Sequence, residues 1–351
     1  MCPRIFCLKM VSNITYINSL PDEILLKIFK LLPIESLLNC ENVCQHWWKL
    51  SHDPAIWRCN LIVHSGNSAL NNADGNLAVI VSHGQYITNI KLRYIDEYSF
   101  IKDILDNCDN LISLELVMCN LDKEFVEYLK RWAKLKKLNL KNSMVYPRDI
   151  KELLLVDIKY FQELTYLDLT DFGISSINCN DLIECAHLCH IYLDKIKTLT
   201  LTNVIDLIIA KQRILQSLHI YGGHSVDDKC LILLSQCPNL RDLAIIRCDP
   251  LTDIGLLSLG NLKKINQLQL WNNIVFTELA LIKTLGDTNL FSLNSLSLSK
   301  IYNMSPVIVD IISENYKNLK FLALYQCPKI LNTSYDKQLK IKFRNIDVVL
   351  F

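Results

Sequence analysis

A short apolar pattern recurs along most of the chain. From residue 87 onward the spacing apolar-x-x-apolar-x-apolar appears ten times in succession, at steps of 24 to 29 residues. Its first positions are Ile87, Leu111, Leu135, Leu164, Leu188, Leu215, Leu240, Ile265, Leu293 and Leu319. Chance supplies one or two such matches, but not ten in step. The spacing predicts one short strand per unit, with the apolar residues facing a core.

The stretches between these strands have helical spacing, as in 228–234 and 253–259. Each unit therefore predicts a strand, a turn and a helix, and such a unit closes its core only by stacking on its neighbours. The period and the strand pattern resemble those of leucine-rich repeats. We expect an α/β solenoid of about ten repeats, with parallel strands on the concave side and helices on the convex side.

The cysteines follow the same period. Relative to the first apolar residue, three lie eight positions later and three lie three positions earlier; these are Cys119, Cys248, Cys327, Cys108, Cys185 and Cys237. The later position is filled by Asn273 in another repeat. Periodic placement indicates reduced thiols packed at turns. The unit 237–253 resembles the cysteine-containing subclass of leucine-rich repeats.

Residues 19–58 have a different pattern. Pro21 suits a first helical turn, and Pro33 ends the apolar stripe that follows it. A second helix is expected around Leu37, and a third is expected to start near Asn42 and to end before Asp53. Three helices in about forty residues rarely stabilise themselves, so this unit is predicted to complete its burial against a partner.

The motif Leu-Pro-x-Glu-Ile-Leu-x-x-Ile-Phe at 20–29, with Leu37-Leu38 and Val43-Cys44-x-x-Trp47, resembles an F-box. With the repeats, the resemblance implies an F-box protein that docks on the adaptor of an SCF ubiquitin ligase, and contacts its cullin and RING subunits indirectly. The implied adaptor-binding residues are Leu20, Pro21, Ile24, Leu25, Ile28, Phe29, Val43 and Trp47. Leu38 and Trp57 are expected to hold the helices together.

The predicted organisation has five parts. They are an N-terminal tail at 1–16, the F-box at 17–58, a linker or N-terminal cap at 59–86, the solenoid at 87–330 and a C-terminal cap or tail at 331–351. Terminal repeats of solenoids generally need such caps.

The composition of the chain argues against a membrane-spanning protein and against nucleic acid as its main partner. Half of the residues are hydrophobic, but no apolar run reaches the roughly 18 residues of a membrane span. Lys plus Arg (37) balances Asp plus Glu (36), which argues against nucleic acid as the main partner. The basic cluster at 134–137 flanks strand residues and is expected to be solvated surface. Without a signal-peptide pattern, a cytoplasmic or nuclear protein is expected.

One cluster resembles a zinc site. Cys185, His187, Cys189 and His190 have the short spacing of metal ligands. However, Cys185 occupies the periodic cysteine position and Leu188 is a strand residue, so the four side chains are not expected to converge. No metal, no cofactor and no catalytic constellation is predicted. Lipidation of Cys2 or Cys7 has no support beyond their terminal position.

Alternation along each strand predicts the concave surface, because successive side chains take opposite sides. The early repeats place charged residues there, including Lys91 and Glu115, and the later repeats place aromatic ones. The predicted target-binding residues are Asp168, Tyr192, Asp194, Tyr221, Ile246, Trp271, Phe321 and Tyr325. The alternative is that loops or the C-terminal tail cover some of these residues as packing.

Three functions remain open on this basis. The favoured one is a non-catalytic substrate receptor of an SCF ligase, in which the solenoid binds a target protein. The second is a repeat scaffold that binds the adaptor or another partner without delivering a target. The third is an enzyme with an embedded site, which is disfavoured because no catalytic motif interrupts the repeats.

Overall fold

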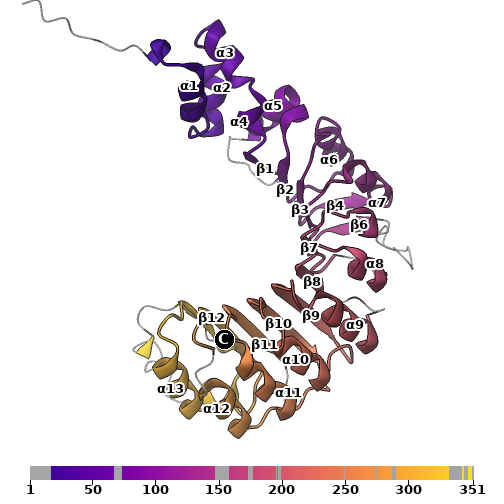
Figure 1. The fold of residues 1–351 in the computed structure, drawn as a ribbon, viewed down its shortest axis with the longest axis vertical. Coiled ribbons are helices and arrows are strands. Elements are labelled where there is room, and N and C mark those ends of the chain that lie inside the picture. The colour runs from indigo at the N-terminus through magenta and orange to yellow at the C-terminus, as the bar shows by residue number, and fades with distance from the viewer. Residues whose placement is uncertain are drawn as a thin grey trace, which may run out of the picture.

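The protein forms an arc with a helical bundle at its N-terminal end (Figure 1). The computed structural model describes residues 17–66, 73–146, 158–172, 177–194, 196, 199–248, 250–272, 275–286, 290–331, 342–343 and 347–349. Strands line the inner side of the arc and helices line its outer side (Figure 1). The predicted α/β solenoid is confirmed. Within these ranges, no helix has the length and apolar character that crossing a bilayer requires.

The N-terminal bundle has four short helices. They are α1 (Asp22–Phe29), α2 (Ile34–Cys40), α3 (Gln45–Ser51) and α4 (Pro54–Trp57), preceded by the 3-10 turn η1 (Ile17–Ser19). The third helix begins later than predicted, so Val43 lies in the turn before it. The sequence prediction also missed α4, which starts where Asp53 Oδ1 accepts a hydrogen bond from the Ala55 amide at 2.7 Å. Pro54 follows that cap in the first turn, a position that needs no amide donor.

One twelve-stranded parallel sheet runs through the arc in chain order. Its strands are β1 (Leu61–Ser65), β2 (Asn89–Arg93), β3 (Ser113–Val117), β5 (Lys137–Asn139), β7 (Tyr166–Asp168), β8 (His190–Asp194), β9 (Ser217–Gly223), β10 (Asp242–Cys248), β11 (Gln267–Trp271), β12 (Ser295–Ser299), β13 (Phe321–Ala323) and β14 (Asp347–Val349). A separate pair joins β4 (Asn120–Asp122) to β6 (Met144–Tyr146). All ten predicted strands are present.

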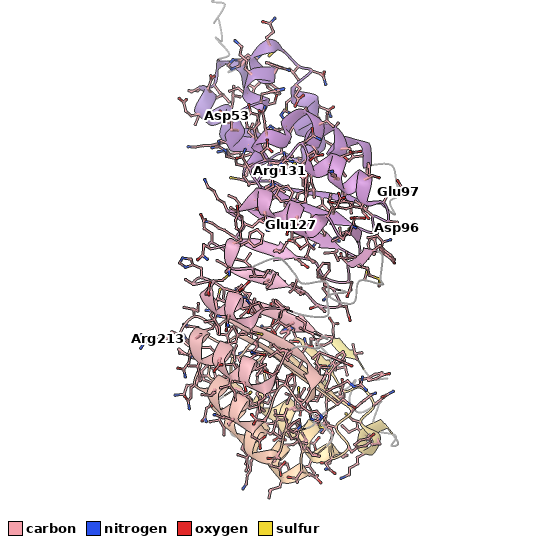
Figure 2. All side chains as sticks on the ribbon, turned by 90° about the vertical axis from the view of Figure 1, so that its right-hand side faces the viewer. Asp53, Asp96, Glu97, Glu127, Arg131 and Arg213 are labelled. Atoms are coloured by element: carbon pink, nitrogen blue, oxygen red, sulfur yellow. The ribbon has the colours of Figure 1, made fainter. Side chains whose placement is uncertain are left out.

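Helices cover the outer side of this sheet (Figure 1). They are α5 (Ala73–His83), α6 (Tyr98–Leu105), α7 (Phe125–Tyr128), α8 (Cys179–Glu184), α9 (Leu201–Lys211), α10 (Asp228–Ser235), α11 (Asp253–Ser258), α12 (Glu278–Gly286), α13 (Pro306–Asn315) and α14 (Pro328–Leu331). The 3-10 turns η2 (Gly84–Tyr86), η3 (Leu129–Trp132), η4 (Ile158–Tyr160) and η5 (Leu259–Asn261) complete the repeats. Arg131, which Figure 2 labels, bridges Asp106 and Asp109 of the preceding repeat.

Two strands of the sheet lie in segments that the sequence assigned to caps. β1 pairs with β2 in register, with Ile62 beside Ile90 and His64 beside Leu92. Its inward residues are thus an isoleucine and a histidine, which do not fit the leucine pattern of the later repeats. β14 pairs with β13 at the other end. Both predicted caps therefore contribute a strand to the sheet.

The core is a stack of leucine columns. Leu243 of β10 aligns with Leu218 of β9 and with Leu268 of β11, and all three side chains are buried. Fully burying one leucine contributes roughly 1.5–3 kcal/mol. Because each column continues across neighbouring strands, every repeat is stabilised by the repeats on its two sides.

Most repeats have a residue in the left-handed backbone region at or just after the end of their strand. Eight such residues that are not glycine have φ between 49° and 58°: Tyr94, Met118, Asn142, Asp171, Arg247, Asn272, Lys300 and Gln326. They occupy one position, seven residues after the first apolar residue of their repeat. Gly222 occupies this position in the repeat that begins at Leu215 and has φ 145° instead. We call the eight residues the turn row; a non-glycine residue there costs about 1–2 kcal/mol.

The next residue explains the first set of periodic cysteines. Cys119 Sγ donates to the carbonyl of Leu92 at 3.6 Å, and Cys327 Sγ donates to the carbonyl of Leu298 at 3.3 Å. Ser143 takes the same place in its repeat, where its hydroxyl donates to the Leu116 carbonyl at 2.9 Å. Each thiol or hydroxyl therefore ties its turn to the preceding strand. The structural interpretation of these cysteines is confirmed.

Thiol titration tests the state of these cysteines. No cysteine in the described ranges belongs to a disulfide, and burial raises the pKa of Cys108 to about 12 and that of Cys119 to about 11. Buried protonated thiols react slowly. Titration of protein made under reducing conditions is expected to find nearly all thiols free after denaturation and few reactive before it. A substantial deficit of free thiols after denaturation would contradict this expectation.

Candidate binding surfaces

An exposed apolar face lies on the N-terminal bundle. Ile24 of α1 is 39% exposed, and Val43 in the turn before α3 is 56% exposed. Leu31, just past the end of α1, is 85% exposed. Pro21 is exposed as well, and Leu20 is half-buried. Apolar side chains so accessible in a bundle this small indicate a surface that another protein covers.

The structure divides the residues that were predicted to contact an adaptor. Leu25 and Phe29 have no exposed surface, so they support the bundle from inside and do not reach a partner. Ile28 and Trp47 are half-buried and pack against the same core. Trp47 meets the edge of the Phe29 ring at 5.1 Å and donates its indole N–H to Asn18 at 2.8 Å. A broad apolar helix face does not reveal which residues point outward, and this explains the correction for Leu25 and Phe29.

A second aromatic assembly joins the bundle to the arc. Trp57 is fully buried, as the sequence analysis expected, and its indole N–H donates to the Ser51 carbonyl at 2.6 Å. Its ring stacks on His83 of α5, with centroids 4.1 Å apart and an interplanar angle of 11°. His83 Nε2 lies 2.7 Å from Glu41 Oε1, and burial lowers the pKa of His83 despite that contact. The bundle and the first repeat therefore share one packed junction.

The junction also brings three metal-ligand types together. Potential ligand atoms of Glu41, His52 and His83 lie within 4.8 Å of one another. His83 Nε2 contacts Glu41, and His52 Nδ1 lies 2.8 Å from the Trp48 carbonyl, whereas the buried His83 Nδ1 has no hydrogen-bond partner among the described residues. These contacts account for the cluster as a hydrogen-bonded junction, so we assign no metal to it.

The concave surface consists of three rows of side chains, because three residues of each strand point away from the leucine columns. The middle row contains Asp168 beside Tyr192, and a second row contains Phe321 beside Ser295. The third row lies at the carboxyl ends of the strands, where Tyr221, Ile246 and Trp271 are in register. Asp194 pairs with Tyr221 in this row, and Tyr325 follows β13 at the same repeat position. The predicted target-binding residues therefore do not lie in one row of the concave surface.

In the early repeats, the concave surface neutralises itself. Glu115 lies 2.9 Å from Lys91 Nζ and 2.6 Å from Lys137 Nζ. Burial opposes ionisation of Glu115, but these hydrogen-bonded ammonium groups outweigh it and hold the pKa of Glu115 below its ordinary value. Lys137 also lies over the Tyr166 ring, 4.9 Å from its centroid. Because the charges pair with each other, this part of the surface offers little to an external ion.

The middle repeats correct the hypothesis for Asp168. Its carboxylate is buried and accepts the Thr170 amide at 2.9 Å and the Tyr166 hydroxyl at 3.3 Å. It therefore stabilises its own turn and is not available to a basic group on a target. Tyr192 packs against His219, with ring centroids 4.4 Å apart. The side chain of Asp194 lies outside the described part of the structure.

The later repeats form a pocket of about 240 Å³. Its walls are Tyr221, Ile246, Arg247, Trp271, Asn272, Ser299, Lys300 and Tyr325. Four of these residues were predicted from strand alternation: Tyr221, Ile246, Trp271 and Tyr325. Phe321 was predicted too, but it belongs to a different row. We call this cavity the C-terminal pocket.

Sequence reasoning missed the polar half of the C-terminal pocket. Arg247, Asn272 and Lys300 belong to the turn row, so the left-handed backbone sets where their side chains begin. Arg247 Nη1 donates to the Tyr221 hydroxyl at 2.6 Å. These residues each come one position after a residue of the third row. That fixed position in the repeat was the signal in the sequence from which they could have been predicted.

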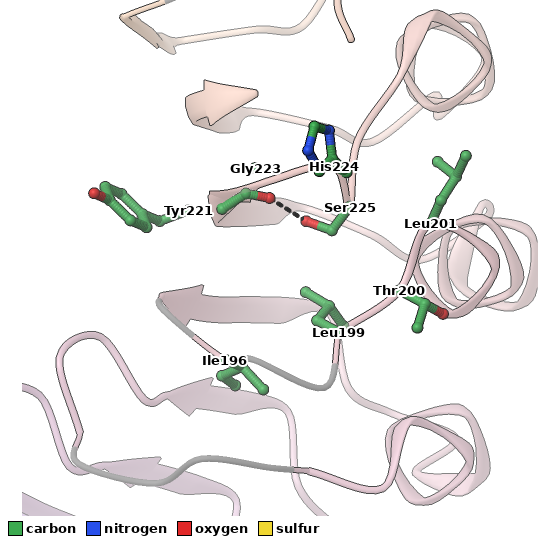
Figure 3. Close-up of a pocket in the computed structure, with 9 residues that line it drawn as sticks. Ile196, Leu199, Thr200, Leu201, Tyr221, Gly223, His224 and Ser225 are labelled. Atoms are coloured by element: carbon green, nitrogen blue, oxygen red, sulfur yellow. Dashed lines mark hydrogen bonds between the residues drawn. The ribbon is translucent and has the colours of Figure 1, made fainter. Parts of the chain in front are cut away.

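A larger cavity of about 620 Å³ lies beside this pocket and shares Tyr221 with it. Ile196 and Leu199 lie on one side, and Gly223, His224 and Ser225 lie on the other (Figure 3). The Ser225 hydroxyl donates to the Gly222 carbonyl at 2.7 Å. Here Gly222, at φ 145°, replaces the usual turn residue. The cavity therefore marks an irregular turn within the otherwise regular stack.

The cysteine and histidine cluster at 185–190 does not converge. Cys185 is buried and donates to the Ile158 carbonyl at 3.4 Å, whereas His187 is exposed. His190 Nδ1 lies 2.8 Å from the Ser217 hydroxyl. Buried Lys211 donates to the carbonyls of Ile183 and Cys185, and burial lowers its pKa. Because Cys185, Cys189 and His190 have their own protein partners and His187 is exposed, the geometry gives no support to a zinc site.

The exposed apolar face lies at one end of the molecule and the aromatic concave pocket lies toward the other, so the two candidate binding surfaces are separate. Comparison with known proteins names the first part, because residues 17–62 match the F-box-like family. The chain therefore carries an F-box-like domain at its N-terminus, followed by a leucine-rich-repeat solenoid.

Relatives match over parts of their length. The chain is 30% identical over 125 residues to F-box protein SKIP19 of Arabidopsis thaliana, covering 33% of this chain and 41% of the relative. It is 43% identical over 49 residues to F-box protein dre-1 of Caenorhabditis elegans, covering 13% and 5%. It is 46% identical over 39 residues to F-box/LRR-repeat protein 12 of Bos taurus, covering 11% and 12%. These matches span less than half of each relative.

Solved structures of similar shape are distant in sequence. The crystal structure of the yeast Rad7 and Elc1 complex contains a chain with a TM-score of 0.49 at 15% identity, covering 81% of this chain and 66% of that one. An internalin, inlF, from Listeria monocytogenes gives a TM-score of 0.45 at 14% identity, covering 84% and 82%.

Proposed function

We propose that this protein is the substrate-recognition subunit of an SCF ubiquitin ligase. The observation that carries the proposal is the accessible apolar face of the F-box-like domain, centred on Ile24 and Val43. A partner is needed to cover this face. In this role the face docks on the ligase adaptor and the arc binds a target protein. The protein acts in the cytoplasm or nucleus as a receptor, and other subunits transfer ubiquitin.

The concave pocket supports the second half of the proposal. Trp271 is 41% exposed although its indole N–H donates to the Ser297 hydroxyl at 2.6 Å. Its ring is therefore held in place while one face stays accessible. Rigid, partly exposed aromatic side chains are the residues that most often dominate protein interfaces.

Affinity purification distinguishes this proposal from its alternatives. The full chain and a variant lacking residues 17–58 are purified from cells, and the bound proteins are identified. Recovery of adaptor and cullin with the full chain alone supports the ligase role. Recovery of adaptor without cullin favours a scaffold. Turnover of a small molecule by the purified chain would contradict a receptor without catalytic activity.

Target capture is expected to depend on the aromatic residues of the third row of the concave surface. Trp271→Ala and Tyr221→Ala are each expected to weaken it by about 1–3 kcal/mol, because both remove buried contact area at an interface centre. The measurement compares recovery of the identified target with recovery of the adaptor, which is expected to stay constant. Tyr302→Ala, an exposed tyrosine outside the pocket, serves as the control. Undiminished capture by both variants, with unchanged thermal stability, would move the target site elsewhere on the arc.

A further inference from the structure

The C-terminal pocket contains an unsatisfied donor. Ser299 of β12 is 2% exposed, and its hydroxyl has no hydrogen-bond partner among the residues that the structure describes. Most buried hydroxyl groups in proteins are paired, because leaving one unpaired costs about 1–3 kcal/mol. Ser299 is one of the residues that line the pocket, so its hydroxyl is a candidate donor to a ligand that binds there.

Two positively charged residues line the same pocket. Arg247 and Lys300 line the pocket, and none of the described lining residues is acidic. No described carboxylate forms an ion pair with Lys300, in contrast to Lys91 and Lys137, which both pair with Glu115. The early concave surface is therefore neutralised from within, whereas Lys300 keeps its positive charge in the pocket. Such a site attracts an anion.

We propose that the C-terminal pocket binds a carboxylate side chain of an acidic segment in a protein target. The Lys300 ammonium, the Arg247 guanidinium and the Ser299 hydroxyl are its donors, and the Asn272 amide is a further one. A carboxylate has two oxygens with about four acceptor positions, which matches this donor set. A phosphate is usually met by several arginines, and this pocket has one.

The aromatic walls of the pocket determine which residues flank the acidic residue in the target segment. Trp271 and Tyr325 are 41% and 38% exposed, and together with Ile246 they give the pocket an apolar side. A segment that alternates acidic and large apolar residues fits both sides. This inference rests on the proposed role of the arc as the reader of targets, and it names the class of segment that is read.

Fluorescence anisotropy with the full chain tests the proposal. The probe is a labelled ten-residue peptide in which Glu alternates with Leu and Phe. A second peptide replaces every Glu with Gln, and a third replaces every Glu with phosphoserine. The Glu peptide is expected to bind at least tenfold more tightly than the Gln peptide, because each charge-assisted hydrogen bond is stronger than its neutral counterpart. It is also expected to bind more tightly than the phosphoserine peptide.

Two pocket variants and one control locate the binding. Lys300→Gln and Ser299→Ala are each expected to weaken binding of the Glu peptide by about tenfold. Lys263→Gln removes an exposed lysine outside the pocket and is expected to change nothing. Ser299→Ala gives a second readout, because it deletes an unpaired hydroxyl. The unliganded variant is expected to be at least as stable as the wild type, which a purely structural serine would not allow.

Several results overturn the proposal. They are no binding of the Glu peptide, equal binding of the Glu and Gln peptides, an equal loss in Lys263→Gln, or binding of the phosphoserine peptide alone. The last result would assign a phosphate site. Adaptor recovery is measured on the same variants. Peptide binding without adaptor binding would remove only the ligase role, and adaptor binding without peptide binding would remove only the pocket assignment.

Discussion

Ile24→Asp is expected to abolish adaptor binding while the arc stays folded. Ile24 is 39% exposed, so the isolated protein tolerates a carboxylate there, which remains solvated. Once a partner covers the face, the same carboxylate loses its water without gaining a counter-charge, and burying it costs several kcal/mol. A loss of about 3 kcal/mol corresponds to more than a hundredfold in affinity.

The measurement is the affinity of the full chain for the purified adaptor, combined with circular dichroism. Ile254→Asp is the matched control, because Ile254 on α11 is 65% exposed and lies on a helix of the arc. It is expected to bind the adaptor normally. Ile28→Asp is a less clean test, since Ile28 also packs against the core. Unchanged adaptor affinity of Ile24→Asp would remove the assignment of the exposed face.

Trp57→Ala is expected to cost about 3–5 kcal/mol of stability in the bundle and its junction, the usual range for emptying a buried tryptophan site. The substitution removes the ring that stacks on His83 and leaves the Ser51 carbonyl without its indole donor. It therefore weakens the bundle and its attachment to the first repeat together.

Urea unfolding and limited proteolysis measure this effect. Trp48→Ala is the control, because Trp48 is 49% exposed and lies on the neighbouring helix α3. A cost below about 1 kcal/mol is expected for the control. Cleavage of Trp57→Ala between the bundle and the arc is expected to be faster than in the wild type. Equal stability of the two variants would contradict a single packed junction.

The repeats were predictable because their constraint is periodic. A strand that buries Leu240, Leu243 and Ile245 must repeat that pattern in the next unit, and the pattern is visible in the sequence. β1 was not predictable in the same way, because His64 occupies an inward position where the pattern expects an aliphatic residue. Main-chain hydrogen bonds between strands form whatever the side chain is, so a histidine is tolerated there. A search for the apolar pattern does not recognise a strand with a histidine at that position.

The binding surfaces were predictable only in part. Strand alternation correctly put Tyr221 and Trp271 on the concave side. It could not show that the Asp168 carboxylate accepts a hydrogen bond from the Thr170 amide in its own turn. Alternation assigns Arg247 of β10 to the inward side and does not extend to Lys300, which follows β12, so it omitted both residues. Their contribution depends on a left-handed backbone, and the hydrophobic pattern carries no information about that conformation.

The order of the strands has a consequence for synthesis on the ribosome. Each strand of the twelve-stranded sheet pairs with the next strand of that sheet along the chain, so a repeat can dock as soon as it emerges, roughly every 1–5 seconds at ordinary translation rates. The junction closes once His83 has emerged, long before the C-terminal pocket exists. A translation product that stops within the arc is therefore expected to carry a finished F-box-like domain without the pocket.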